Sequence, residues 1–179
     1  IEAHYDLGNQ LFETFLDSTL MYSSALFADG ITDLHDASIE KLDHICRKLN
    51  LSPTDHVLEI GTGWGGFAIH AAEIYGCKIT TTTISEEQYE HATRLVNERG
   101  LDDRVTVLKE DYRDLTGQYD KLVSIEMIEA VGHHFLDTYV NTLSERLKPD
   151  GLALIQAITI VEQRYQIAVS SVDFIKRYI

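Results

Sequence analysis

Two carboxylates stand where this sequence could do chemistry. Glu126 and Glu129 follow the apolar run Tyr119–Ile125, which is typical of a buried strand. In open parallel sheets, ligands bind beyond the carboxyl ends of the strands, and a carboxylate there can act as a base or hold one. His133 and His134 come next, but adjacent histidines rarely face one ion from a helix, so we expect no metal site.

A glycine-rich turn, EIGTGWGG at residues 59–66, follows an earlier apolar run. Gly61 and Gly63 allow a tight turn and a close approach of the backbone to a ligand, and the helix that begins after them offers free N–H groups. The acidic Glu59 before the glycines is typical of sites for S-adenosylmethionine, whose ammonium group it can attract directly or through water. A turn without a ligand and a nicotinamide site are the alternatives.

The next two strand ends supply candidates for the rest of such a cofactor. The second run ends without a carboxylate, so Thr83 and Gln88 are the groups that could bond the ribose hydroxyls. After the third run, Asp111 is placed to accept a hydrogen bond from an adenine amino group, with Tyr112 as a ring contact. A solvated acidic turn is the alternative for residues 110–114.

These candidates need an α/β fold to bring them together. From Pro53 onward, short β-branched runs alternate with helical patterns, which predicts a parallel sheet with helices on both faces, a Rossmann-like methyltransferase fold. We expect strands at 55–60, 77–83, 104–108, 119–125 and 152–158, and helices at 4–15, 36–49, 67–75, 85–99, 134–147 and 164–178.

The same pattern suggests three regions. Residues 1–50 are expected to form a helical cover over the site, residues 51–160 the cofactor-binding core, and residues 161–179 a helical segment that starts a further part. A complete methyltransferase sheet usually has seven strands and five are predicted here, so we expect the domain to be C-terminally incomplete.

Composition limits the classes of function. The chain has 179 residues, 44% of them hydrophobic, which suits one domain with a sizeable core. Its net charge of −14 disfavours nucleic-acid binding and unaided docking on an anionic membrane. Cys46 and Cys77 are expected to be reduced core thiols. A cytoplasmic location is expected, with peripheral membrane contact through segments outside the chain as an open alternative.

Five motifs occur in a distinctive order: HYDLGN (4–9), MYSSALF (21–27), EIGTGWGG (59–66), TISEEQ (83–88) and EAVG (129–132). Together they cover nearly the whole chain and resemble the cyclopropane-fatty-acyl-phospholipid synthase family, which includes the mycolic acid cyclopropane synthases. The resemblance implies an enzyme of lipid biosynthesis that transfers a methyl or methylene group from S-adenosylmethionine to the double bond of an unsaturated acyl chain. A bound bicarbonate would then take a proton.

The resemblance also implies roles for individual residues. It assigns cofactor contacts to Tyr22, Ser23, Gly61, Gly63, Trp64, Thr83, Ile84 and Gln88. Glu129 would hold the bicarbonate. The family commonly has Cys, His and His where this chain has Ser24, Ala130 and Gln156. Ser24 and Gln156 can still hydrogen-bond an anion, together with the backbone of Ile158. These departures leave the product open between a cyclopropane and a methyl or methylene group.

Two other functions compete with this one. A methyltransferase acting on nitrogen or oxygen of a soluble small molecule would need a smaller, polar pocket and a base such as His133. A non-catalytic cofactor-binding fragment is the third. The lipid hypothesis predicts an apolar tunnel beside Glu129. The sequence leaves open whether the protein forms a homodimer. Residues expected to line the tunnel from the N-terminal cover are Phe12, Phe15, Leu26 and Phe27.

Overall fold

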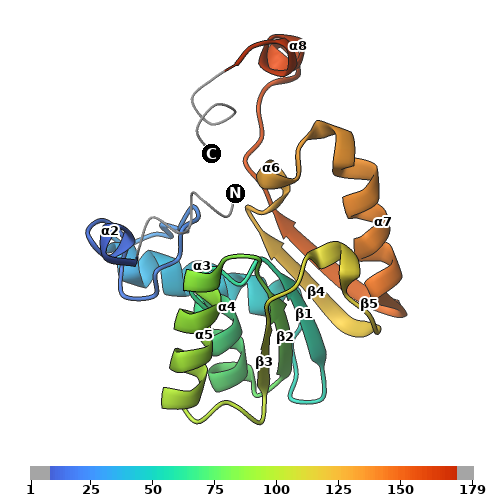
Figure 1. Cartoon of the computed structure of the whole chain (residues 1–179). Helices are drawn as coiled ribbons and strands as arrows, with labels where there is room; N and C mark the ends of the chain where they lie inside the picture. The colour runs from blue at the N-terminus through green and yellow to red at the C-terminus, as the bar shows by residue number, and fades with distance from the viewer. Residues whose placement is uncertain (1–8, 173–179) are drawn as a thin grey trace.

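A five-stranded parallel sheet forms the centre of the molecule, in a computed structural model that describes residues 9–172. The strand order is β3-β2-β1-β4-β5 (Figure 1), which confirms the predicted Rossmann-like α/β fold. The strands are β1 (His56–Ile60), β2 (Lys78–Thr82), β3 (Val105–Leu108), β4 (Tyr119–Ile125) and β5 (Leu147–Gln156). Because the chain order reverses between β1 and β4, the carboxyl ends of these two strands open a crevice.

Helices cover both faces of the sheet. The helical elements are α2 (Asn9–Glu13), α3 (Leu34–Lys48), α4 (Gly66–His70), the π-helical turn η1 (Ala71–Tyr75), α5 (Glu86–Glu98), η2 (Tyr112–Asp114), α6 (Ile128–Val131), η3 (His133–Phe135), α7 (Leu136–Arg146) and α8 (Glu162–Ser170). One core cluster joins α3, α4 and α5 to the sheet through residues such as Val57. The other core cluster joins α7 to the opposite face of the sheet through residues such as Leu58. Helix α7 therefore lies across the sheet from α4 and α5 (Figure 1).

The alternation of side chains along β1 explains why this strand needs cover on both faces. Val57 and Leu58 are fully buried and point into opposite clusters. A strand enclosed in this way favours a continuous apolar run, which is the pattern seen in the sequence. Cys46 and Cys77 are free and buried in the first cluster, as predicted.

Several predicted boundaries are wrong by a few residues. The fifth strand was expected at 152–158 but runs over Leu147–Gln156, because the pairing with β4 resumes on both sides of an irregularity near Tyr119. Residues 148–151 are therefore part of the strand instead of a turn, and Ile158 lies beyond its end. The helix expected at 134–147 begins as the turn η3 and continues as α7.

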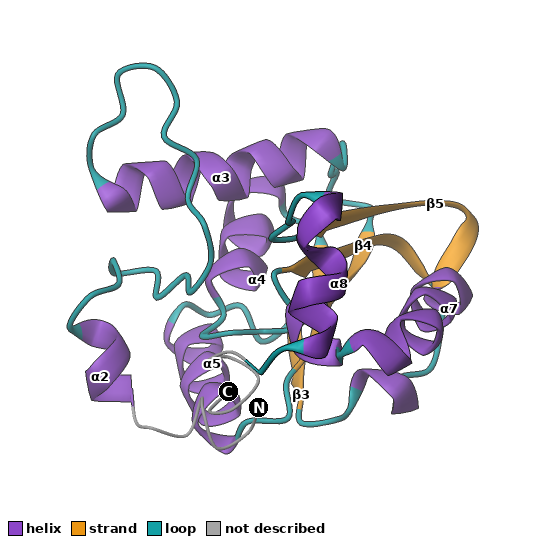
Figure 2. Cartoon of the chain, turned by 90° about the horizontal axis from the view of Figure 1, so that it is seen from above, coloured by secondary structure: helices purple, strands orange, loops and turns teal. Residues whose placement is uncertain are grey.

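The N-terminal region lies over the start of α4. Helix α3 starts two residues before the predicted position, since the Asp33 side chain caps it by accepting from the N–H groups of His35 and Asp36. Figure 2 shows α3 beside α4, with α2 farther out on the same side of the molecule. Of the helix expected at 4–15, residues 9–13 are helical and 4–8 lie outside the described part.

The C-terminal helix α8 stands away from the sheet (Figure 1). It covers Glu162–Ser170, so it starts before the predicted 164–178, and residues 173–178 of that prediction lie outside the described part. No helix within residues 9–172 is long and apolar enough to cross a membrane.

Candidate active site

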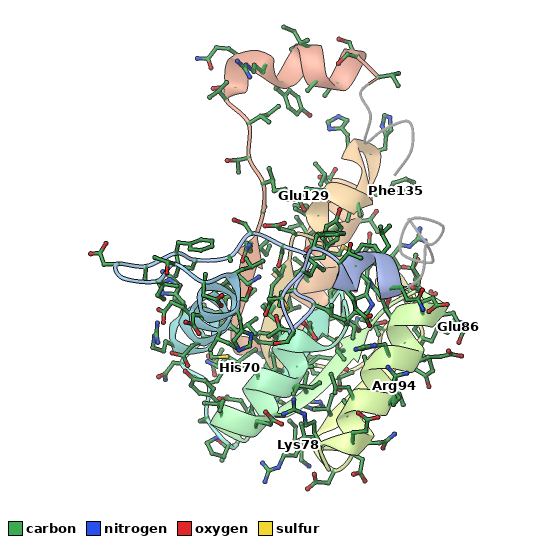
Figure 3. The ribbon with its side chains drawn as sticks, turned by 90° about the vertical axis from the view of Figure 1, so that its left-hand side faces the viewer. His70, Lys78, Glu86, Arg94, Glu129 and Phe135 are labelled. Atoms are coloured by element: carbon green, nitrogen blue, oxygen red, sulfur yellow. The ribbon has the colours of Figure 1, made fainter. Side chains whose placement is uncertain are left out.

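A cavity of about 320 Å³ lies at the carboxyl ends of β1, β2 and β4. In Figure 3, Glu129 and Phe135 mark this end of the molecule, and Lys78, the first residue of β2, lies towards the opposite end. Every residue predicted to contact the cofactor lines the cavity. They are Tyr22, Ser23, Glu59, Gly61, Gly63, Trp64, Thr83, Ile84, Gln88, Asp111 and Tyr112.

The glycine turn is fixed against β2 and open towards the cavity. The N–H groups of Gly61 and Thr62 both donate to the carbonyl oxygen of Thr82, at 3.1 and 3.0 Å. Gly61 has φ +99° and Gly63 has φ +53°, which favour glycine. A Cβ at Gly61 would lie 3.3 Å from the side chain of Met127, whereas a Cβ at Gly63 would meet nothing within 4 Å. The backbone at Gly63 can therefore be approached closely by a ligand.

Glu59 is a buried carboxylate in the wall of this cavity. Its side chain is 2% exposed, and its Oε2 accepts a hydrogen bond of 2.6 Å from the hydroxyl of Thr81. Burial raises the pKa of Glu59 to about 8. A buried carboxylate is stable when it is protonated or when it meets a cation, so the ammonium group of an amino-acid cofactor fits this position.

The ribose candidates form a second buried polar group. The Thr83 hydroxyl donates to Oε1 of Gln88 at 2.8 Å and accepts from the N–H of Ser85 at 3.1 Å. Ser85 caps α5 by accepting from the N–H of Gln88 at 3.3 Å. Since the amide oxygen of Gln88 already accepts from Thr83, its amide nitrogen is the group that can donate towards a ligand.

Asp111 has a partner that the sequence reasoning missed. Its carboxylate accepts from the backbone N–H, Nε and Nη2 of Arg113, at 2.9, 2.8 and 2.6 Å. Arg113 therefore holds the pKa of Asp111 below its ordinary value. Tyr112 packs edge-on against Tyr139, with 5.6 Å between ring centroids. The two side chains thus have fixed positions at the cavity wall.

The residues predicted for catalysis fall into two groups. Oε1 of Glu126 accepts from the N–H of Ser24 at 2.9 Å and from Nε2 of Gln156 at 2.8 Å. Oε1 of Glu129 accepts from the N–H of Ile158. The structure thus brings Ser24 and Gln156 to Glu126, and brings only Ile158 to Glu129. Glu126 lines the cavity, whereas the other four residues are not among those that line it.

Comparison with known proteins agrees with this arrangement. The family model described as mycolic acid cyclopropane synthetase matches residues 1–179. This chain belongs to that family. The tuberculostearic acid methyltransferase of Mycobacterium tuberculosis is 41% identical over 100% of this chain and 43% of its own length. The cyclopropane-fatty-acyl-phospholipid synthase of Escherichia coli K12 is 44% identical over 88% of this chain and 40% of its own.

Solved structures of the family share the fold. A cyclopropane synthase from M. tuberculosis superposes with a TM-score of 0.87 at 30% identity, covering 99% of this chain and 63% of that one. A mycolic acid cyclopropane synthase complexed with SAH and CTAB gives 0.83 at 33%, covering 87% and 54%. The chain therefore spans less than half the length of the curated relatives above.

In this member of the family, a buried lysine also belongs to the site. Lys41 of α3 is 4% exposed and its Nζ donates to the hydroxyl of Ser23 at 2.6 Å. Burial lowers the pKa of Lys41 to about 8, while the negative charges of Glu126 and Asp17 act in the opposite direction. Its spacing of four residues from Ile45, on the buried face of the helix, was the available signal.

The apolar residues expected to line a tunnel from the N-terminal cover lie elsewhere. Phe12 is 2% exposed and stacks on Trp64 with 4.4 Å between ring centroids, so it is part of a small core. Phe15, Leu26 and Phe27 are exposed at the surface. None of the four lines the cavity.

The two histidines after α6 take no part in the cavity. Both are exposed, and Nδ1 of His133 is 2.7 Å from the hydroxyl of Tyr165. Within residues 9–172, no group of three or more His, Cys, Asp or Glu side chains is arranged to hold a metal ion.

Proposed function

We propose that this chain is the cofactor-binding part of an enzyme that transfers a methyl or methylene group from S-adenosylmethionine to the double bond of an unsaturated phospholipid acyl chain. The observation that carries the proposal is the cavity at the switch point of the sheet, where all the predicted cofactor contacts meet around the buried Glu59. The names of the relatives, a fatty-acyl-phospholipid synthase among them, support a lipid acceptor.

The residues present fit the cofactor. The cavity of about 320 Å³ lies within the range of ligand pockets, roughly 300–1,000 Å³. Glu59 would meet the ammonium group, and Thr83 with Gln88 would meet the ribose. Asp111 would accept from the adenine amine, with Tyr112 and Ile84 beside the ring. The backbone at Gly61, Gly63 and Trp64 would contact the cofactor from the turn after β1. Tyr22 and Ser23 would cover the cofactor from the N-terminal region.

The bound cofactor would supply an electrophilic methyl group. An alkene is a weak nucleophile, so the chain must hold it close to that group and keep water away. Apolar side chains at the β4 side of the cavity suit this task, among them Met127, Val131 and Phe135. Contact with a membrane surface is part of the proposal, because the acceptor is a phospholipid.

A proton must then leave the methylated chain. The family resemblance proposes a bicarbonate held by Glu129 together with Ser24, Gln156 and Ile158. In this structure the N–H of Ile158 donates to Glu129, and Ser24 and Gln156 donate to Glu126. An anion bound there would have to displace carboxylates that belong to the chain itself.

Calorimetry of S-adenosylmethionine binding tests the cofactor assignment. Gly63→Val adds a branched side chain at φ +53°, in the open space that faces the ligand, and should abolish binding. Gly100→Val is the matched control, since Gly100 has φ +65°, also has no neighbour within 4 Å and does not line the cavity. Equal binding by both variants, or none by the folded wild type, would contradict the proposal.

The acceptor is tested with the full-length protein. Labelled S-adenosylmethionine and vesicles of an unsaturated phospholipid should give label in the acyl chains, detected by mass spectrometry after release of the fatty acids. Label that appears only on nitrogen or oxygen of soluble acceptors would favour the small-molecule methyltransferase instead.

A further inference from the structure

We propose that the carboxylate of Glu126 is the base that removes the proton from the methylated acyl chain, in the place that an exogenous anion would otherwise take. This inference rests on the proposed function and adds a catalytic residue to it. Three observations support it: the hydrogen bonds that hold Glu126, its backbone conformation, and its position at the cavity.

Two distant parts of the chain hold the Glu126 side chain. Its Oε1 accepts from the N–H of Ser24 at 2.9 Å and from Nε2 of Gln156 at 2.8 Å, and Nε2 of Gln156 also donates to the carbonyl of Ser24 at 3.2 Å. These are donors that would otherwise bind an anion. Within residues 9–172, Oε2 makes no hydrogen bond, so this oxygen is available to take a proton.

The backbone of Glu126 is held in a conformation that is unfavourable for its residue type. Its φ is +49°, in the left-handed region that glycine favours. The N–H of Glu126 donates to the carbonyl of Gln156 at 2.8 Å, which fixes this conformation at the end of β4. Such backbone strain concentrates at functional sites, where it directs a side chain that the reaction needs.

Position separates Glu126 from its neighbour Glu129. Glu126 is half-buried and lines the cavity, whereas Glu129 is exposed and is not among the lining residues. The charge of Lys41, whose Nζ lies against Ser23 on the same side, interacts with Glu126. Of the two carboxylates, Glu126 is therefore the one that can reach a substrate beside the cofactor.

The proposed step balances without a redox partner. The alkene π electrons attack the methyl carbon of a sulfonium donor, so that one C–C bond forms, the S–CH3 bond breaks with release of a neutral thioether, and a positive charge is left on the neighbouring carbon. A C–H bond then breaks and its proton goes to Oε2 of Glu126. If the C–H belongs to the added methyl, its electron pair closes the cyclopropane ring. If a hydride shift first moves the charge to the methylated carbon, the same electron pair forms a methylene double bond.

The wild-type protein provides the first test, which needs no variant. In buffer depleted of carbon dioxide, methyl transfer by the full-length protein should change less than twofold when bicarbonate is added. A loss of fivefold or more on depletion, restored by bicarbonate, would overturn the proposal while leaving the proposed function intact. No transfer under any condition would overturn both.

Substitution provides the second test. Glu126→Gln keeps the size of the side chain and removes the base, so turnover should fall about 100-fold or more, the usual contribution of a general base. Binding of S-adenosylhomocysteine, measured by calorimetry, should stay within about threefold and shows that the variant is folded. Glu126→Gln with more than a tenth of the wild-type turnover would contradict the role of base.

The variant Glu126→Gly tests whether an added anion can bind in the space left by the Glu126 carboxylate. Glycine suits φ +49°, and the removed carboxylate leaves the Ser24 and Gln156 donors free. Turnover should be low and should rise at least tenfold with added bicarbonate or formate. High turnover without added anion, or no rise with either anion, would count against the proposal. Asn50→Gly is the matched control, because Asn50 has φ +50° but does not line the cavity, and it should leave turnover unchanged.

Discussion

The polar side chains on the two sides of the cavity differ in burial. On the side of β1 and β2, Glu59, Thr81 and Ser85 are each at most 2% exposed; Thr81 donates to Glu59, and Ser85 accepts from the N–H of Gln88. On the side of β4 and β5, Ser24 is exposed, and Glu126 and Gln156 are half-buried. After the proposed function, we call the first the cofactor side and the second the acceptor side.

This difference separates a site that is formed in advance from one that can rearrange. Buried polar groups with satisfied hydrogen bonds are rigid, because breaking one bond leaves an unpaired group out of water. Exposed hydrogen bonds can exchange with water at little cost. The cofactor side should therefore keep its shape without a ligand, whereas the acceptor side could rearrange when the proposed acyl chain covers it.

The largest expected effect comes from breaking the packing under the cofactor side. Phe12 lies 4.4 Å from the ring of Trp64, which belongs to the glycine turn. Phe12→Ala should lower the free energy of unfolding by about 3–5 kcal/mol, measured by urea unfolding. Phe15→Ala, at a ring that is 51% exposed, should cost less than about 1 kcal/mol. Equal losses would show that the cover is not anchored at Trp64.

The next largest effect is a dependence of stability on pH, which we expect from the buried Glu59 of the cofactor side. Folding raises the pKa of Glu59 from 4.5 to about 8, so the folded state binds more protons between these values. Its contribution to stability is present below pH 4.5 and is lost as the pH rises through 8. Glu59→Gln does not titrate, so its stability relative to wild type should increase by on the order of 3 kcal/mol from pH 5 to 9. Glu145→Gln, at an exposed side chain, is the control.

Glu59 should also couple cofactor binding to the release of a proton. An ammonium group beside Glu59 favours the ionised carboxylate, so binding of S-adenosylmethionine at pH 7 should release a proton from wild type and not from Glu59→Gln. Calorimetry in two buffers of different ionisation enthalpy measures this release. A stability difference between the two proteins that does not change with pH would refute the buried, protonated state.

The fold and the residues that line the cofactor side of the cavity could be predicted from the sequence because both depend on local patterns. β-branched runs between glycine and proline identify the strands, and the residues just after each run lie at one edge of a parallel sheet. Thr83 and Asp111 are predicted in this way, and both line the cavity. The start of β5 was misplaced because residues 148–151, with their proline and glycine, suggest a turn, and only the pairing with β4 shows otherwise.

The acceptor side could be predicted only in part, since its contacts join distant segments. Ser24 and Glu126 are 102 residues apart and meet through one hydrogen bond. The resemblance put Ser24 and Gln156 with Glu129, whereas the fold places them with Glu126 because the chain bends at φ +49° after β4. A positive φ at a glutamate cannot be predicted from the pattern of hydrophobic residues.

A smaller effect concerns the connection between the two sides. The hydroxyl of Tyr139 in α7 donates to that of Ser124 at 2.8 Å, and Ser124 donates to the carbonyl of Ile60 at 3.1 Å. This buried chain links α7 and β4 to β1. Tyr139→Phe should lower the free energy of unfolding by about 1–2 kcal/mol in urea. Tyr165→Phe, whose hydroxyl meets His133 at the surface, should have almost no effect.

The smallest effect on stability is expected at the edge of the cofactor side, where Asp111 and Arg113 pair in contact with solvent. If Asp111 accepts from the adenine amine, Asp111→Ala should weaken S-adenosylmethionine binding about tenfold, the loss of one charge-assisted hydrogen bond. Arg113→Ala should change binding less than about threefold, since the Asp111 carboxylate remains, and should leave the urea midpoint unchanged.

Calorimetry on the two variants separates a direct contact from a positioning role. A tenfold loss in Arg113→Ala as well would mean that the ion pair, by holding the 3-10 turn at Tyr112–Asp114, is what shapes the adenine end of the cavity. The cofactor side would then depend on an exposed interaction at this one end, and its advance formation would be limited to the buried groups around Glu59 and Gln88.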